Sequence, residues 1–365
     1  MTRASTILMG LSVLCLAACF VDTTLPDLSV QTGAGQTDAG YCTTDELLEF
    51  PAETLQMHVI DVGQGDAIWI RTPYFEEPEF ESRDVLIDVG PSGLNDSSPG
   101  GETVVDYMIR MGRRLDDPID AVVISHAHAD HYGGLPAVAA AFRIERYYDP
   151  SYIPSSSSLW STREDARQAT EDTWNATLSM SSGSTLADDL FQPTEVFGNY
   201  VDAQLLWAAD SLAGLPASSN ENDTSLVFSI RWSDRRILLM GDAEEHVEEE
   251  LVRAAQAGEV DLTASVLKVG HHGSSTSSTV DFLNAALGNA DESTWAVISS
   301  GRKSFGGEQL PSQQTITALK TRLNEYRLLS TENGDDGRSE GEEHDDDHVL
   351  VTIGPNGEVR ACYVP

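Results

Sequence analysis

The chain has 365 residues, of which 40% are hydrophobic and 7% aromatic, so it can bury a large core and is not disordered throughout. Its 59 acidic and 22 basic residues give a formal net charge of −37, which is spread along the chain. Proteins that grip nucleic-acid phosphates over a broad face usually have a basic surface, so this charge argues against a general polyanion binder.

The first 19 residues, MTRASTILMGLSVLCLAAC, have an early arginine, a short apolar stretch and small residues before Cys19. This pattern is typical of a secretory signal and is too short for a permanent membrane span. The tetrad LAAC resembles a bacterial lipobox, in which cleavage leaves an acylated cysteine; an ordinary signal peptide or a short anchor helix is the alternative. We therefore expect an exported cell-envelope lipoprotein, facing the periplasm or the cell surface and held on the membrane through lipidated Cys19, with a flexible tether over residues 20–50.

Export bears on the four cysteines. Cys15 leaves with the signal and Cys19 carries the lipid, so Cys42 and Cys362 remain near the two ends of the expected domain. In an oxidising compartment they form a disulfide that closes nearly the whole chain, or they stay as two free thiols. Neither stands in a CxxC spacing or beside the histidines, so neither is an expected metal ligand.

Short apolar runs bounded by glycine predict strands, and periodic apolar positions predict helices. The predicted strands are residues 55–63, 66–72, 84–90, 119–125, 225–232, 235–242, 264–270 and 294–300, followed by a hairpin that turns at 355–357. The predicted helices are residues 103–114, 135–142, 244–257, 280–287 and 312–326. There is no internal repeat and no break in composition, so two sheets covered by helices in one domain over residues 51–365 are expected.

Two segments have weaker patterns. Residues 151–222 are rich in serine and loop-like, with one helix predicted at 162–178, and are interpreted as an insertion or lid over a site. The acidic run at 332–348 is interpreted as a solvated loop, with weak calcium binding as the alternative.

The segment SHAHADHYGG, residues 125–134, places His126, His128, Asp130 and His131 within six positions of a chain that has nine histidines. The apolar run before it predicts a buried strand that ends at this cluster. Imidazole and carboxylate groups are ligands for zinc and similar divalent ions. The spacing therefore predicts a metal-binding loop at the end of a strand.

Further ligands are offered at the ends of two later strands. LLMGDAEE presents Asp242, and LKVGHHGSS presents His271 and His272. We prefer His271 as the ligand because it stands nearer the predicted strand end, although sequence alone leaves His272 open.

Taken in order, SHAHADHYGGL, MGDAEE and LKVGHHGSS resemble the successive motifs of the metallo-β-lactamase-fold hydrolases. The opening segments VGQGD at 62–66 and LIDVG at 86–90 resemble those of the ComEC-like branch, which is related to the hydrolase domain of competence DNA-uptake proteins. The likeness runs from about residue 55 to the carboxyl end, apart from residues 151–222. It implies an α/β fold, a four-layer αββα sandwich with a single catalytic domain.

The resemblance also implies two divalent metal ions, zinc with manganese or iron as alternatives. His126 and His128 would bind the first, Asp130 and His131 the second, Asp242 would bridge both, and His271 or His272 would complete the second site. Asp130 and Asp66 are the candidate catalytic residues, while Asp88 would orient the loop through hydrogen bonds. A capped turn is the alternative role for Asp66 and Asp88.

Two departures from the family pattern affect this assignment. Many members supply a further histidine to the first metal, but no histidine occurs between residues 132 and 241, so Asp223 or water would have to replace it. A Tyr-Gly-His-Pro element that is common near the end is also missing, and Glu308 is the candidate substitute.

The resemblance implies a hydrolase that uses a metal-activated water, with phosphodiester bonds of nucleic acid or nucleotides as the expected substrates. A hydrolase of small esters, thioesters or lactams is the second hypothesis, and a catalytically silent metal-binding surface module is the third. Lys268, Arg302 and Lys303 are candidates for a local basic patch near the metals. The chain has no run of spanning helices, so it is not expected to form a channel itself.

Overall fold

The computed structural model describes residues 40–43, 47, 53–74, 82–92, 101–150, 152, 154, 156–169, 177–179, 201–209, 212–213, 215–301, 304–305, 308–332 and 348–364. The signal segment, Cys19 and most of the acidic run lie outside these residues. The chain divides into two units, Met1–Gln36 and Thr37–Pro365, and every described residue belongs to the second. No helix among the described residues is both long and apolar enough to cross a membrane.

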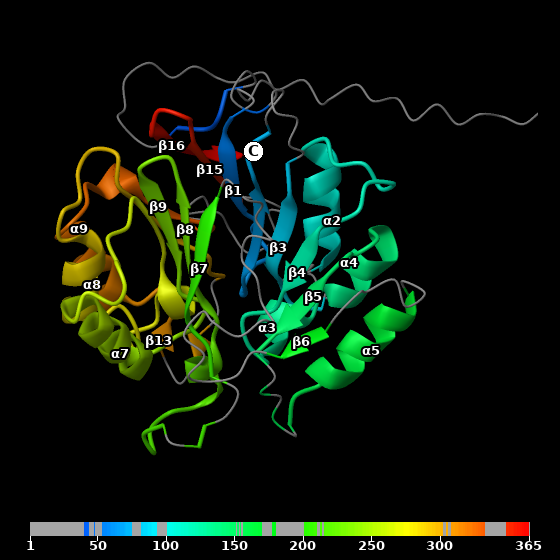
Figure 1. Ribbon diagram of the computed structural model, residues 1–365, viewed down its shortest axis with the longest axis horizontal. Helices are drawn as coiled ribbons and strands as arrows, with labels where there is room; N and C mark the ends of the chain where they lie inside the picture. The colour runs from blue at the N-terminus through cyan, green and yellow to red at the C-terminus, as the bar shows by residue number, and fades with distance from the viewer. Residues whose placement is uncertain are drawn as a thin grey trace, which may run out of the picture. The chain divides into compact units, whose positions relative to one another are not determined.

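The second unit contains two mixed sheets that face each other, with helices on their outer faces (Figure 1). The first sheet has the spatial order β16 (Val359–Val364), β15 (His348–Ile353), β1 (Leu55–Val59), β2 (Ala67–Arg71), β3 (Asp84–Val89), β4 (Ala121–Val123), β5 (Tyr147–Asp149) and β6 (Thr177–Ser179). The second has the order β14 (Leu328–Ser330), β11 (Trp295–Ile298), β10 (Val266–Lys268), β9 (Arg235–Leu239), β8 (Val227–Trp232) and β7 (Asp202–Trp207). A short ribbon pairs β12 (Ser304–Phe305) with β13 (Glu308–Gln309).

The helices lie on the two outer faces. In Figure 1, α2 (Gly101–Arg110), α4 (Leu135–Ala141) and α5 (Leu159–Ala169) cover the first sheet, and α7 (Glu245–Gln256), α8 (Val280–Leu287) and α9 (Gln313–Lys320) cover the second. The one-turn helix α3 (Ala129–Tyr132) follows β4. This arrangement of helix, sheet, sheet and helix confirms the expected αββα sandwich.

Strand periodicity explains the three apolar clusters. Alternate residues Leu55, Met57 and Val59 of β1 face the second sheet and belong to the cluster between the sheets, which also contains Phe228 and Val266. A second cluster lies between the first sheet and its helices, and a third between the second sheet and α7, α8 and α9. The core therefore holds the strand ends, and the loops that follow them, in fixed positions.

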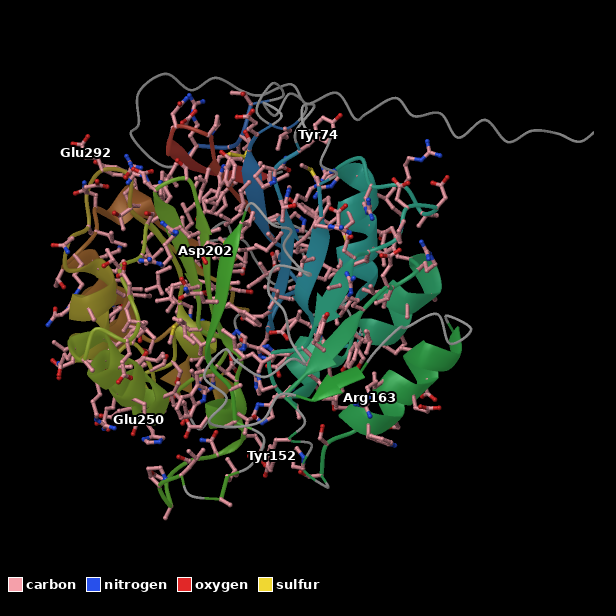
Figure 2. The ribbon with its side chains drawn as sticks, viewed as in Figure 1. Tyr74, Tyr152, Arg163, Asp202, Glu250 and Glu292 are labelled. Atoms are coloured by element: carbon pink, nitrogen blue, oxygen red, sulfur yellow. A yellow bond between two sulfur atoms is a disulfide. The ribbon has the colours of Figure 1, made fainter. Side chains whose placement is uncertain are left out.

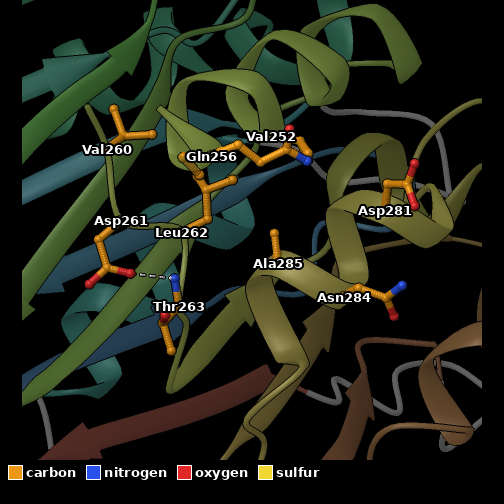
Figure 3. A pocket seen from close by; sticks show the side chains of 10 residues that line it. Val252, Gln256, Val260, Asp261, Leu262, Thr263, Asp281, Asn284 and Ala285 are labelled. Carbon is orange, nitrogen blue, oxygen red and sulfur yellow. Dashed lines mark hydrogen bonds between the residues drawn. The ribbon is translucent and has the colours of Figure 1, made fainter. Parts of the chain in front are cut away.

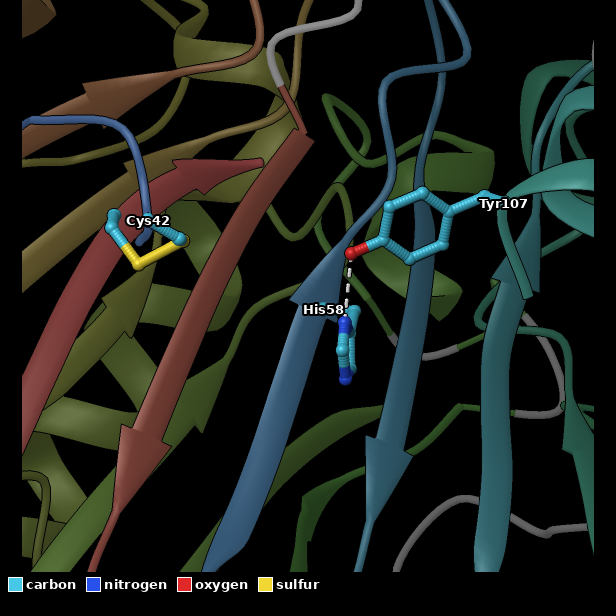
Figure 4. The surroundings of a disulfide bond; sticks show 4 residues. Cys42, His58 and Tyr107 are labelled. Carbon is cyan, nitrogen blue, oxygen red and sulfur yellow. Dashed lines mark hydrogen bonds between the residues drawn. A yellow bond between two sulfur atoms is a disulfide. The ribbon is translucent and has the colours of Figure 1, made fainter. Parts of the chain in front are cut away.

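A disulfide joins Cys42 to Cys362 on β16, so the structure selects the paired alternative for these two cysteines (Figure 4). A backbone bridge between Tyr41 and Tyr363 runs beside it. Close by on β1, the buried ring of His58 accepts or donates a hydrogen bond with the Tyr107 hydroxyl at 2.8 Å. The segment before β1 is thus fixed to the last strand of the chain.

Most predicted elements are present, but residues 151–222 differ from the expected pattern. The predicted helix at 162–178 is wrong at its carboxyl end, because α5 ends at Ala169 and residues 177–179 form the edge strand β6. The described parts of this region extend both sheets, since β6 pairs with β5 and β7 pairs with β8. The ribbon β12–β13, which carries Glu308, was not predicted.

Candidate metal centre

The histidine cluster follows β4 as the sequence predicts. The strand is fully buried, and the chain after it passes through Ser125 into α3. His126 and His131 are completely buried, whereas His128 and Asp130 are partly exposed. Because the strand is fixed in the core, the loop presents four donor side chains at one edge of the sheets.

A first group of donors consists of His126, His128 and Asp242, whose ligand atoms lie within 4.8 Å of one another. His126 Nε2 lies 3.0 Å from His128 Nδ1. A hydrogen bond at this distance requires one ring to donate, whereas a cation between the two nitrogens would accept both lone pairs. The group therefore suits a divalent cation.

A second group consists of Asp130, His131 and His272. His272 Nε2 lies 3.7 Å from Asp130 Oδ2 and 3.4 Å from Asp242 Oδ2. Our preference for His271 at this position does not agree with the geometry. The turn Gly270–Gly273 has left-handed backbone angles at both histidines, so the more distant residue, His272, turns back into the buried site.

Two hydrogen bonds fix the rings of the second group. His131 Nδ1 donates to Asp88 Oδ2 at 2.7 Å, and the same carboxylate accepts from the backbone and hydroxyl of Ser125. His272 Nδ1 donates to the carbonyl oxygen of Ser299 at 2.9 Å. In both rings Nδ1 is engaged in a hydrogen bond and Nε2 points at the other donors, where it would give its lone pair to a cation in place of a proton. Asp88 therefore lies in the orienting position expected from the sequence.

Asp66 lies against this centre and pairs with a buried cation. Lys268 Nζ donates to Asp66 Oδ2 at 2.8 Å and to the carbonyl oxygen of Val269 at 3.1 Å, and Lys268 is fully buried. Asp66 Oδ1 lies 3.3 Å from His272 Nδ1. The prediction that Lys268 belongs to a local basic patch is therefore wrong. Its ammonium is buried and pairs with the Asp66 carboxylate inside the protein. Arg302 and Lys303 lie outside the described residues.

Gly65 allows the loop between β1 and β2 to approach the loop that carries the histidine cluster, residues 125–134. Gly65 has a φ of 149°, and a Cβ at this position would lie 2.3 Å from the carbonyl oxygen of Asp130. The backbone NH of Asp66 donates to that same oxygen at 3.2 Å. Only glycine fits such a contact without displacing the loop.

The electrostatics favour cations. Burial raises the pKa of a carboxyl, but the imidazoles of His272 and His131 hold the pKa of Asp242 well below its ordinary value. Burial lowers the pKa of His126, and the neighbouring His131 lowers it further, so that ring is neutral. The centre thus offers an ionised carboxylate, Asp242, together with a neutral imidazole, His126.

Asp242 Oδ2 is the point on which the donors converge. It lies 3.2 Å from His131 Nε2, 3.4 Å from His272 Nε2, 3.7 Å from His126 Nε2 and 3.9 Å from His271 Nε2. Asp242 Oδ1 and the Nε2 atoms of His131 and His272 are buried without any hydrogen-bond partner. Buried polar atoms without partners cost free energy, and bound cations would satisfy them. The residues present therefore fit a metal centre.

The remaining expected residues lie apart from the two groups. Asp223 is buried and its Oδ1 has no hydrogen-bond partner, but it belongs to none of the donor groups found among the described residues. Glu308 forms part of β13, and its side chain lies outside the description. Ser125 and Glu244 were not identified from the sequence, because their contacts join segments that are distant along the chain.

The surface near the second sheet contains a different hollow. A pocket of about 550 Å³ between α7 and α8 is lined by residues that include Val252, Asp261 and Asn284, and by none of the metal donors (Figure 3).

Acidic side chains lie on separate parts of the described surface, as Asp202 on β7 and Glu292 in the turn before β11 illustrate (Figure 2). Neither feature adds a titratable cluster to the metal centre.

The chain is similar in sequence to two competence-related proteins. The chain is 24% identical over 307 residues to ComE operon protein 3 of Bacillus subtilis (strain 168), covering 80% of this chain and 34% of that protein. It is 26% identical over 252 residues to competence protein ComA of Neisseria gonorrhoeae, covering 69% and 28% respectively. The chain thus spans about a third of the length of these relatives. Its fold is similar to that of Tm1679, a metal-dependent hydrolase of the beta-lactamase superfamily, with 13% identity, a TM-score of 0.43 and coverage of 76% and 96%.

The family model of the metallo-beta-lactamase superfamily matches residues 62–292, which is more than half of the chain. Both donor groups, together with Asp66 and Asp88, lie within this range. The competence relatives are consistent with the ComEC-like branch. The chain therefore belongs to the metallo-beta-lactamase superfamily and is a metal-dependent hydrolase of that fold.

Proposed function

We propose that this protein is an exported, lipid-anchored hydrolase of phosphodiester bonds in nucleic acid or nucleotides, with two divalent cations, zinc first among them, bound around Asp242. The observation that carries the hydrolytic part is the convergence of imidazole nitrogens on Asp242 Oδ2 from loops of both sheets. The choice of phosphodiesters is supported by the likeness to two competence proteins.

When bound, a pair of divalent cations would lower the pKa of a water molecule and stabilise the negative charge that develops on the phosphate oxygens. The chain's own residues keep the donors in place. Asp88 holds His131 through Nδ1, and the Ser299 carbonyl holds His272 through Nδ1, so neither ring has to rotate before it can bind. Asp130 is partly exposed and lies beside His272, where its carboxylate could reach an incoming substrate or water.

The acidic composition favours a second candidate, hydrolysis of small esters, thioesters or lactams. A net charge of −37 repels a long polyanion, and burial of Lys268 removes one expected source of local attraction. A small substrate meets much less of this repulsion.

A substrate panel separates these candidates. Bis(p-nitrophenyl) phosphate, nitrocefin and a simple thioester would be incubated with the purified protein, with and without added Zn²⁺ or Mn²⁺, and with Asp242→Ala as the control. We expect the wild type to hydrolyse the phosphodiester only when a cation is present, and we expect Asp242→Ala to lose this activity. Preferential turnover of nitrocefin or the thioester would favour the second candidate. A protein that binds cations but hydrolyses none of them would be a silent metal-binding module.

The anchor is proposed from the LAAC tetrad and the polar segment that follows it. The test is fractionation of cells that express the wild type or Cys19→Ser. We expect the wild type in the membrane fraction and the folded variant outside it. A variant that stays with the membrane as the wild type does would show that Cys19 is not the anchor.

A further inference from the structure

The two donor groups each contain two histidines, but the first reaches three donors only by counting Asp242, whereas the second has three donors without it. His126 and His128 supply two nitrogens and Asp242 supplies an oxygen. No histidine occurs between residues 132 and 241 to supply a third nitrogen. Neither Asp223, the expected substitute, nor His271 belongs to a donor group found within the described part of the chain. His271 nevertheless has an Nε2 atom that lies 3.9 Å from Asp242 Oδ2, so this ring is the candidate for the third nitrogen.

An unusual backbone holds His271 near Asp242, one of the three donors of this group. His271 and His272 have φ angles of 47° and 52°, which place two consecutive side-chain-bearing residues in the left-handed region. Such angles are unfavourable for residues other than glycine. The backbone NH of His271 donates to the carbonyl oxygen of Gly241 at 3.0 Å, next to Asp242. This backbone turns both rings toward one carboxylate oxygen, with His272 Nε2 at 3.4 Å and His271 Nε2 at 3.9 Å.

The hydrogen bonds of His271 determine which nitrogen is free. Its Nδ1 lies 3.0 Å from Thr276 Oγ1 and 3.1 Å from Glu244 Oε1. The Thr276 hydroxyl donates its own hydrogen to Glu244 Oε1 at 2.9 Å. Both neighbours of Nδ1 are therefore acceptors, so Nδ1 carries the hydrogen and Nε2 carries the lone pair. A carboxylate that orients a histidine in this way is typical of metal-binding rings.

Glu244 is itself fixed in place. Its Oε2 accepts from Asn220 Nδ2 at 2.9 Å, and its Oε1 accepts from Asn222 Nδ2 at 3.0 Å. Asn222 Nδ2 also lies 3.4 Å from His271 Nε2, but this contact is long and the same amide group serves Glu244. The network therefore positions the ring without using its Nε2 lone pair in a short hydrogen bond.

We propose that His271 is a ligand of the cation held by His126 and His128, with Glu244 as the residue that positions its ring. The two adjacent histidines then serve different cations: His271 completes the first group and His272 belongs to the second. This assignment requires that the protein binds metal, but it does not depend on which substrate is hydrolysed.

The test measures cation binding rather than turnover. The full-length protein is stripped of metal and titrated with Co²⁺, and the bound cation is counted by elemental analysis while the visible absorption of the coordinated Co²⁺ is recorded. His271→Asn is the main variant, because asparagine also tolerates the left-handed backbone. His246→Asn, on α7 and outside both donor groups, is the matched control.

We expect His271→Asn to weaken one of two binding events by about 10- to 100-fold and to change the absorption of that cation, while His246→Asn matches the wild type. In the double variant His271→Asn, His128→Ala, only the cation held by His126 and His128 should bind more weakly. In the double variant His271→Asn, His272→Ala, the second cation should bind more weakly as well. Glu244→Gln should weaken the first event less than His271→Asn does.

Circular dichroism and urea unfolding of each metal-free variant check that it is folded. Wild-type affinity and absorption in a folded His271→Asn protein would overturn the proposal. So would a double variant, His271→Asn with His272→Ala, that binds Co²⁺ as His272→Ala alone does. A wild type that binds no divalent cation would overturn both this assignment and the proposed function.

Discussion

The ammonium of Lys268 lies 2.8 Å from the carboxylate of Asp66, and both side chains are almost completely inaccessible to solvent. Burial would raise the pKa of Asp66, but Lys268, together with His272, holds it below the ordinary value. The pair joins the loop after β1 to the end of β10, so it connects the two sheets beside the metal centre.

We expect Lys268→Met to lower the free energy of unfolding by about 3–5 kcal/mol, because it removes the ammonium partner of the buried Asp66 carboxylate. The matched control is Arg231→Met, which removes an ion pair with Asp202 whose side chains are 48% and 47% exposed. Exposed pairs contribute about 0–1 kcal/mol. Urea unfolding of the metal-free proteins gives the comparison. Equal midpoints for the two variants would show that the buried pair is not a stabilising contact.

Asp242→Ala should weaken both binding events, because Asp242 is the carboxylate that the donors of both groups surround. His128→Ala should retain about one cation, since His128 belongs to the first group only. Elemental analysis of the two purified variants after dialysis against Zn²⁺ checks this difference. If Asp242→Ala kept its full metal content while His128→Ala lost both cations, Asp242 would not be shared between two cations.

Stability should fall in acid because of His348. Burial of this side chain, together with the charge of Arg110, lowers its pKa from 6.5 to about 3. Below pH 6.5 the unfolded chain takes up a proton that the folded protein excludes, so the free energy of unfolding falls between about pH 6.5 and pH 3. The slope is at most about 1.4 kcal/mol per pH unit for this one group, and above pH 6.5 the group has no effect.

His348→Asn isolates this contribution. The asparagine oxygen can replace His348 Nδ1, which accepts a hydrogen bond from the backbone NH of Asp61 at 2.9 Å, but it does not titrate. Urea unfolding of the metal-free variant from pH 7 to pH 4 should show a shallower decline than the wild type. Parallel curves for the two proteins would mean that His348 does not contribute to acid sensitivity.

The disulfide between Cys42 and Cys362 should stabilise the domain by about 2–5 kcal/mol, because it closes a loop of 320 residues in the unfolded chain. The double variant Cys42→Ser, Cys362→Ser should unfold at a lower urea concentration. Reductant should shift the wild type toward the variant and leave the variant unchanged. A wild type whose unfolding is insensitive to complete reduction would contradict this expectation.

The sequence predicts the sandwich because its strands are short apolar runs that end at glycine, as in LQMHVIDVG and ASVLKVG. It also predicts the cluster from His126 to His131, since these donors are neighbours along the chain. It could not choose between His271 and His272, because the choice depends on left-handed angles at two residues other than glycine. The network around Glu244 was missed for a different reason. Its partners Asn220, Asn222 and Thr276 meet it only through the packing of separate loops.

The strand β1 pairs with β2, which follows it closely, and with β15, which is close to the end of the chain. A nascent chain leaving the ribosome therefore carries an unpaired edge on β1, with its apolar residues Leu55, Met57 and Val59, until β15 has been made nearly 300 residues later. Pairing between such distant segments slows folding, and unpaired edges promote aggregation while they last. Synthesis of β15 and β16, rather than of the histidine loop, sets the earliest moment at which the first sheet can be completed.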